Sequence, residues 1–245
     1  MITSWARIPK VTVAIARQKA NRNVLSVWRS GGIKFQSTSA NTASKVAAAP
    51  PPKIKNVDPN ILDLRVGLIK DIRRHENADS LYVSQIQVGP TGEEKSLVQV
   101  CSGLVGLVPM EELHGRRVII VNNLKPSKMR GVASQAMLLC ADGEVTVDGE
   151  TKPNIEPINP PEDAPLGGIL AFVHEDDTTG NISVEDGKEE IKKRIKSKAF
   201  QAVSEDLTID NNMRVVWRQK LILCYDTISR CCTVSDLTLV GAQVR

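Results

Sequence analysis

The chain has 245 residues, of which 41% are apolar, enough for one or two domains with a core. The core should be mainly aliphatic, because only 3% of the residues are aromatic. No apolar run approaches the roughly 20 residues of a membrane-spanning helix, so we expect a soluble protein with no membrane partner. The five cysteines are odd in number and lack metal-ligand spacing, which favours reduced thiols and predicts no metal and no cofactor.

The charge is divided unevenly along the chain. The formal net charge is +4, but residues 1–57 hold ten Lys/Arg and no acid, whereas residues 58–245 hold 22 Lys/Arg against 28 Asp/Glu. Residues 141–190 are the most acidic, with 14 acids and two bases. Any nucleic-acid-binding surface on the body of the protein must therefore be a local patch.

Residues 1–45 have the composition of a mitochondrial transit peptide, rich in Arg, Ser and Ala and free of acids. Arg17 and Lys19 interrupt the best apolar stretch, which argues against a secretory signal. The competing interpretation is a basic arm that adds RNA affinity, and the alternative location to the mitochondrial matrix is the cytoplasm. Residues 46–57 form an Ala/Pro linker, so we expect a disordered N-terminal segment before the folded body.

Five short strands are predicted next, with one helix between the third and the fourth. Apolar alternation or β-branched residues mark strands at 62–72, 81–88, 97–101, 116–121 and 134–140. Pro109 suits the first turn of a short helix over 109–113. This order predicts an all-β body, a five-stranded OB-fold barrel that binds its ligand with one face and the adjoining loops.

The loop between the last two strands carries Lys125, Lys128 and Arg130, with Pro126 and Gly131 as turn residues. Three cations on a short loop form a surface suited to phosphate groups. A solvated charged hairpin is the other interpretation that the composition allows.

The rest of the chain is predicted to mix helix and strand. An acidic hairpin is expected over 142–155, around two Asp-Gly turns. In the charged run 185–198, Ile191 and Ile195 lie one helical turn apart, which predicts a helix with solvated lysines in its basic C-terminal half. Strands are expected at 215–225 and 231–240.

The run from Asn123 to Ala141, N-L-K-P-S-K-M-R-G-V-A-S-Q-A-M-L-L-C-A, closely resembles the tRNA-binding domain of the endothelial-monocyte-activating polypeptide II family. That module occurs as an accessory factor of aminoacyl-tRNA synthetases and as an appended domain of some methionyl- and tyrosyl-tRNA synthetases. Further motifs match in order: L-D-L-R-x-G at 62–67, A-D-S-L-Y-V at 78–83, S-G-L-V at 102–105, V-P-x-E at 108–111, and P-P followed by Gly at 160–167. The close resemblance covers roughly residues 60–172.

The resemblance implies an OB-fold tRNA-binding domain at 58–172 and a C-terminal α+β extension at 173–245 that packs on the barrel. In the family this extension occupies the surface that simpler relatives use to dimerise, which implies a monomer. RNA contacts are expected from nine residues, the cations holding phosphates: Lys125, Lys128, Arg130, Arg65, Ser102, Asn123, Ser134, Gln135 and Met137. The barrel motifs contain only one aromatic residue, Tyr82, which favours backbone and shape recognition of folded RNA over base stacking.

Two functions remain in competition. The first is a tRNA-binding protein that acts in trans as an aminoacyl-tRNA synthetase cofactor in mitochondria. The second is a non-catalytic scaffold or ribosome-associated module that works through the acidic region 141–190 and the C-terminal extension. An enzyme finds little support, because the sequence contains no nucleophile elbow, no P-loop and no paired His/Asp cluster, and no catalytic residue is predicted.

Overall fold

The structure, a computed structural model, describes residues 57–89, 96–175 and 192–245. The predicted transit peptide (1–45) and the linker up to residue 56 lie outside the described residues, as does the expectation that this segment is disordered. All described residues belong to one compact unit, Pro51–Arg245. Among them, no helix is long and apolar enough to span a membrane.

Strands are the most common structure in the described chain, which has only a few short helices. In chain order the elements are η1 Pro59–Ile61, β1 Leu64–His75, β2 Ala78–Gln87, β3 Leu97–Ser102, α1 Met110–Leu113, β4 Arg117–Val121, β5 Ser127–Met129, β6 Val132–Ser134, β7 Met137–Leu138, β8 Cys140–Val147, β9 Glu150–Pro157, β10 Ile169–His174, α2 Ser197–Ser204, β11 Leu207–Ile209, β12 Val215–Trp217, β13 Leu221–Cys224, η3 Ile228–Arg230, η4 Leu237–Leu239 and β14 Gln243–Val244. The expectation of a mostly β protein is confirmed.

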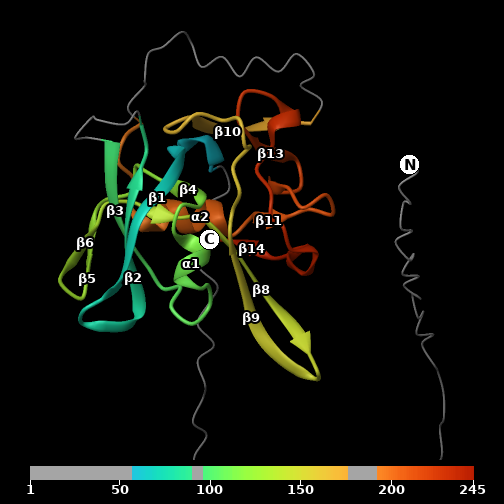
Figure 1. Ribbon diagram of the computed structural model, residues 1–245. Coiled ribbons are helices and arrows are strands. Elements are labelled where there is room, and N and C mark those ends of the chain that lie inside the picture. Colours follow the sequence, from blue (N-terminus) through green and yellow to red (C-terminus); the bar gives the residue numbers. More distant parts are fainter. Residues whose placement is uncertain (1–56, 90–95, 176–191) are drawn as a thin grey trace, which may run out of the picture. The chain divides into compact units, whose positions relative to one another are not determined.

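The N-terminal half is an antiparallel sheet centred on β1, which pairs with β2 on one side and with β4 on the other. β3 continues the sheet beyond β2 (Figure 1). β7 continues it beyond β4. Gly67 lets β1 and β2 approach closely, because a Cβ at this position would lie 2.5 Å from Cγ2 of Ile86.

The two ends of this half-sheet approach each other without a ladder between them. Gln135, between β6 and β7, donates its backbone N–H to Gln99 O of β3 at 2.8 Å. Cys101 N–H donates to the hydroxyl of Ser134 at 3.0 Å. No sheet closes on itself through strand pairing among the described residues, so the five-stranded barrel stays a prediction.

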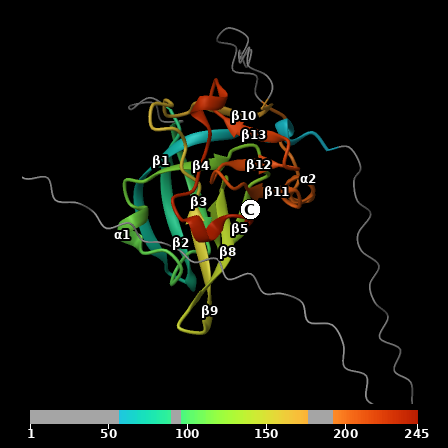
Figure 2. The ribbon, with the colours of Figure 1, turned by 90° about the vertical axis from the view of Figure 1, so that its right-hand side faces the viewer.

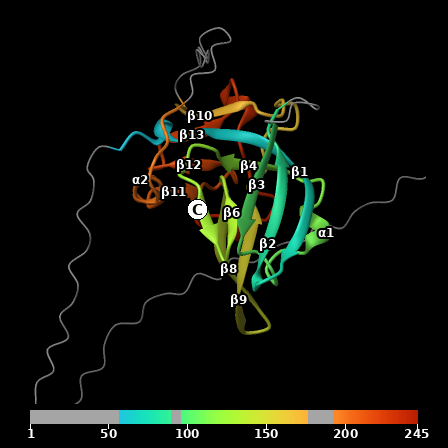
Figure 3. The same ribbon diagram turned by 90° about the vertical axis from the view of Figure 1, so that its left-hand side faces the viewer.

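The C-terminal half extends the same sheet. β10 pairs with the start of β1, and the sheet then continues through β13, β12, β11, β14 and β8 to β9. Figures 2 and 3 show from two sides that α2 lies beside β11 and β12, and that the β8–β9 hairpin projects from the sheet. Residue 172 lies within β10, so the predicted boundary between the barrel domain and the extension falls inside a strand. The domain limits themselves stay predictions.

The largest hydrophobic core lies between the two halves. Leu64, Ile119 and Leu139 of the first half meet Leu207 and Leu223 of the second, all at 0–1% exposure. Each fully buried side chain of this size contributes about 1.5–3 kcal/mol. A second core lies inside the first half, around Ile69, Ile86 and Ile120. The C-terminal half therefore packs on the first half by burying apolar surface.

Four strand or helix predictions are wrong in detail. The single strand expected at 215–225 is divided into β12 and β13, which form a hairpin. The single strand expected at 134–140 is interrupted, because its residues divide among β6, β7 and β8. The described part of the helix expected at 185–198 is extended from Lys192 to Lys196, where Ile195 forms a bridge with Leu124, and helix α2 begins only at Ser197. The region 231–240 forms isolated bridges and the short helix η4 in place of a strand.

Candidate nucleic-acid interface

The cationic loop is a tight β-hairpin, β5–β6, at the edge of the N-terminal half (Figure 1). Met129 pairs with Val132, and the two residues between them have positive φ angles, 48° at Arg130 and 94° at Gly131. These angles match a type I′ turn, the two-residue connection that suits the twist of antiparallel strands. Glycine adopts this conformation freely, but arginine does so at a cost in backbone strain. Arg130 therefore lies at the tip of the hairpin in a backbone conformation that costs free energy.

The hairpin is attached to β3 by an amide network. Gln99 accepts the backbone N–H of Gln135 and donates its own N–H to Oε1 of Gln135, both at 2.8 Å. The side-chain amide of Gln99 donates to Ala133 O at 2.7 Å and accepts from the amide of Gln85 at 2.9 Å. The network fixes β6 without using any of the cations.

His75 attaches the opposite strand of the hairpin to β1. Its Nδ1 accepts the backbone N–H of Asn77 at 3.0 Å, which assigns the ring hydrogen to Nε2. Nε2 then donates to Met129 O, also at 3.0 Å. With β6 bound to β3 and β5 bound to β1, the orientation of the hairpin is set from both sides.

Two of the cations lie on this hairpin, and the third, Lys125, lies on the segment that leads into it. Lys125, Lys128 and Arg130 are all exposed, and none forms an ion pair with an acid among the described residues. An exposed cation without a protein partner is free to neutralise a phosphate and release its counterions. The structure thus brings together the three residues on which the phosphate prediction rests.

Three of the other predicted contact residues are used inside the protein. Asn123 is 3% exposed; it accepts from Asp63 N–H and donates to Ile61 O and Lys193 O. Ser134 is 4% exposed and donates to Ala136 O. The Arg65 guanidinium is buried against Asp63, with Nε 3.0 Å from Oδ1. Their polar atoms hold the hairpin and β1 in place, and direct contact of these three residues with RNA stays a prediction.

The three remaining predicted residues lie at accessible positions. Gln135 is exposed beside the hairpin, Ser102 ends β3 and is partly exposed, and Met137 is half-buried against the larger core. Of these, Gln135 has a side-chain amide whose donor group is not used by any protein acceptor in the described chain. Gln135 directly follows β6 of the hairpin, and all three residues suit short polar or apolar contacts.

The sequence did not single out two arginines of β1. Burial raises the pKa of the Cys101 thiol. Arg73 lies near enough to this thiol for its positive charge to oppose that rise. Arg74 lines a pocket of about 370 Å³ together with Tyr82 and residues 106–111. Both arginines immediately precede His75, the residue that anchors the hairpin. The neighbours of these two arginines depend on the pairing of β1 with β2, which no local sequence pattern indicates.

Metal chemistry has no support in the described chain, where no three His, Cys, Asp or Glu side chains are grouped to hold an ion. Burial raises the pKa of Cys140 to about 12, against a smaller opposing effect of Arg116. Burial also raises the pKa of Cys224 to about 12. Thiols with raised pKa values are poor nucleophiles and poor metal ligands at neutral pH.

Comparison with known proteins places the hairpin inside a matched region. The family described as a putative tRNA-binding domain matches residues 64–168. The cytoplasmic tyrosine–tRNA ligase of Xenopus tropicalis is 39% identical over 186 residues, which cover 74% of this chain and 32% of the relative. The tRNA-aminoacylation cofactor arc1 of Schizosaccharomyces pombe is 43% identical over 121 residues, covering 49% of this chain and 25% of the relative.

One solved structure is similar over both halves of the described body. The C-terminal domain of Plasmodium vivax p43 superposes with a TM-score of 0.56 at 22% identity, and the match covers 78% of this chain and all of that one. At this identity the likeness concerns the fold alone. The chain spans only about a third or less of the length of the tyrosine ligase and arc1 relatives.

Proposed function

Residues 64–168 belong to the putative tRNA-binding domain family, and from that premise we propose that this chain binds folded tRNA through the cations of the β5–β6 hairpin. Lys125, Lys128 and Arg130 hold phosphates of the RNA backbone. Gln135, Ser102 and Met137 make the shorter contacts beside them. Recognition is of shape and backbone, as suits a protein with so few aromatic side chains.

One observation supports this proposal above the others: the three cations are exposed, and no acid of the described residues forms an ion pair with them. The body of the protein, residues 58–245, carries more acids than bases, so bulk charge does not attract RNA. Affinity must come from a few placed cations. A hairpin held by Gln99 and His75 presents them in one geometry, which reduces the entropy lost on binding.

We further propose that the protein acts in trans as a non-catalytic cofactor of an aminoacyl-tRNA synthetase. The name of the arc1 relative, a tRNA-aminoacylation cofactor, supports this role. The partners would be tRNA and the synthetase, and no catalytic residue is assigned. Addition of the full chain to an aminoacylation assay should lower the KM for tRNA of its cognate synthetase; a KM unchanged for every synthetase of the compartment contradicts the cofactor role.

The proposed location is the mitochondrial matrix, on the basis of the acid-free, Arg-rich residues 1–45. A fluorescent reporter fused to residues 1–45 should enter mitochondria. A diffuse cytoplasmic signal would favour the basic-arm interpretation of this segment.

We also propose a monomer in which residues 58–172 form a five-stranded OB-fold barrel covered by residues 173–245. The burial of Leu64 and Ile119 against the C-terminal half supports this, because that surface is not left for a second copy. Sedimentation equilibrium of the full chain at micromolar concentration should give the monomer mass, and a dimer mass contradicts the proposal.

A scaffold function is the second candidate, and the projecting β8–β9 hairpin favours it. The exposed tip of this hairpin carries Glu144, Asp148 and Glu150 against Lys152 alone. An acidic surface repels phosphate and suits a basic protein partner. On this alternative the wild-type chain fails to bind tRNA.

The deciding experiment is a titration of the full chain with tRNA at several salt concentrations. Replacing Lys125, Lys128 and Arg130 by Gln removes up to three phosphate contacts and keeps the buried supports intact. The slope of log affinity against log salt should fall by about 2–3, since each duplex phosphate contact contributes roughly 0.9. A wild-type chain without tRNA affinity, or a triple variant with unchanged affinity, contradicts the function.

A further inference from the structure

A second basic segment lies directly against the base of the cationic hairpin, although about 70 residues separate them in the chain. Ile195 forms a parallel bridge with Leu124. Ile195 N–H donates to Asn123 O at 2.8 Å, and Lys125 N–H donates to Ile195 O at 3.1 Å. The guanidinium of Arg194 donates to Leu124 O at 3.0 Å. Residues 193–196 are thus fixed alongside residues 123–125.

The alternation of side chains places the cations of the two segments on the same side. Ile195 and Leu124 are paired, and both are half-buried against the larger core. Successive side chains of an extended chain point to opposite sides, so Arg194 and Lys196 point away from this core, as does Lys125. All three are exposed. The segment therefore adds its charges next to Lys125.

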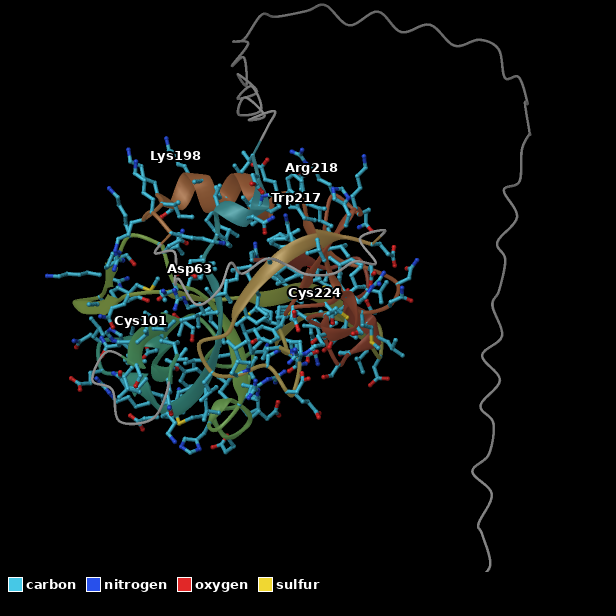
Figure 4. The ribbon with its side chains drawn as sticks, turned by 90° about the horizontal axis from the view of Figure 1, so that it is seen from above. Asp63, Cys101, Lys198, Trp217, Arg218 and Cys224 are labelled. Atoms are coloured by element: carbon cyan, nitrogen blue, oxygen red, sulfur yellow. The ribbon has the colours of Figure 1, made fainter. Side chains whose placement is uncertain are left out.

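Three lysines of this segment contribute no ion pair to the described fold, whereas Lys192 and Arg194 donate to backbone carbonyls. Lys193, Lys196 and Lys198 are exposed, and no ion pair joins them to an acid in residues 57–89, 96–175 or 192–245. Lys196 and Lys198 lie at the N-terminal end of α2, where the helix dipole disfavours positive charge. Figure 4 shows Lys198 pointing outward from this helix.

The arginines that follow α2 in the same half, unlike the exposed Lys220, are paired with acids. Arg214 contacts Asp210 at 2.8 Å, and Arg218 contacts Asp206 at 2.7 Å and lies over the ring of Trp217. The contrast separates arginines that hold the fold from lysines that have no acid to neutralise them. A group of uncompensated cations is expected where an anionic partner binds.

We infer that Lys193, Arg194, Lys196 and Lys198 form a second phosphate-contacting surface, continuous with Lys125, so that both halves of the chain hold one RNA backbone. This inference rests on the proposed tRNA binding. The ligand is the sugar-phosphate backbone, because lysines of this kind recognise charge and carry no information about base identity. The hairpin and the segment together form one cationic track across the junction of the halves.

The test uses the full chain and a tRNA titration at several salt concentrations. The segment variant carries Lys193→Gln, Lys196→Gln and Lys198→Gln; Arg194 is retained because its guanidinium supports Leu124 O. The control variant carries Lys70→Gln, Lys152→Gln and Lys220→Gln, three exposed lysines on β1, on β9 and before β13. Both variants lose the same charge, and thermal melting checks that each remains folded.

The segment variant should weaken tRNA binding about tenfold or more at moderate salt, with a fall in salt slope of about 2–3, while the control changes binding less than about twofold. If the segment variant matches the control while the hairpin triple variant loses affinity, the inference is wrong and the proposed function stands. If the wild type does not bind tRNA, the proposed function itself fails. If the segment variant retains tRNA binding but loses binding to poly-glutamate, the surface serves an acidic protein and the inference is overturned.

Discussion

The β5–β6 and β8–β9 hairpins both reverse direction through two residues with positive φ angles, of which the second is glycine. In β8–β9 the turn is Asp148-Gly149, a pair that favours the type I′ turn, and eight residue pairs from Cys140↔Pro157 to Val147↔Glu150 form its ladder. In β5–β6 the turn begins with Arg130, and the ladder has only three pairs. The acidic hairpin has a long ladder of its own, whereas the short cationic hairpin depends more on its neighbours.

The difference shows how a short loop can present charge in a fixed geometry. The bonds that hold β5–β6 come from Gln99, Ser134 and His75, none of which is a cation of the loop. Its lysines and Arg130 are consequently not required for the fold and remain available to a ligand. The following predictions test this division between supporting and contacting residues.

The largest effect is expected for Ser134→Ala. The buried hydroxyl of Ser134 accepts from Cys101 N–H at 3.0 Å and donates to Ala136 O at 2.9 Å. Its loss leaves a buried N–H without a partner, so the free energy of unfolding should fall by about 1–3 kcal/mol in urea denaturation. In β8–β9 the exposed hydroxyl of Thr146 contacts that of Thr151, and Thr146→Ala should cost less than about 0.5 kcal/mol. Equal costs would show that β5–β6 needs no outside support.

A smaller effect of opposite sign is expected for Arg130→Asn, which gives β5–β6 the Asn-Gly turn that hairpins favour. Because Arg130 has a φ of 48°, the substitution should raise the free energy of unfolding by up to about 1 kcal/mol. The same variant should lower the salt slope of tRNA binding by about 0.9.

Asp148→Asn is the matched control in β8–β9. It replaces one residue suited to this turn by another, so it should change stability by less than about 0.5 kcal/mol and leave tRNA binding unaltered or slightly stronger. A loss of stability in Arg130→Asn would mean that the Arg130 side chain supports the hairpin.

The smallest effect is expected in the pH dependence of the free energy of unfolding. Asn154 of β9 donates to Asp236 at 2.8 Å, which joins the acidic hairpin to η4. The backbone N–H of Thr238, then the side chains of Asn154 and Thr238, lower the pKa of Asp236 below its ordinary value. A lowered folded-state pKa contributes stability above the unfolded-state pKa of about 3.9, and this stability is lost as the pH falls through the lower folded-state pKa.

Urea midpoints measured from pH 6 to pH 2 should therefore fall slightly more steeply for the wild type than for Asp236→Asn, whose amide does not titrate. The difference should be small, because solvent screens this carboxylate. Identical pH profiles would show that the Asp236 contact contributes nothing to the attachment of β8–β9.

The local pattern of the sequence was sufficient to predict β1 to β4, since apolar alternation follows the face on which a strand is buried. The short helix at Met110–Leu113 was predicted from Pro109 and is confirmed. The cations of the hairpin were also recognisable, because charge on a loop needs no partner to be exposed.

What could not be predicted depends on contacts between distant residues. Asn123 was predicted as an RNA contact. In the structure its side-chain amide forms hydrogen bonds with Asp63 and with the backbone of Lys193, which are about 60 and 70 residues away. The segment around Ile195 was predicted as helix from its spacing, yet pairing with Leu124 makes it extended. Tertiary pairing overrides local propensity at both positions, and no local pattern records it.

The place of β14 in the sheet has a consequence for synthesis. β14 lies between β8 and β11, pairing Val244 with Ala141 and Gln243 with Thr208, although it follows both strands in the chain. On the ribosome, β1 to β4 can pair soon after they emerge, whereas the ladder from β11 to β8 must await translation of Val244. Until then the apolar side chains of Ile119 and Leu139 lack part of their cover. Slow elongation over the last residues therefore prolongs the time for which this apolar surface of the nascent chain is open to aggregation.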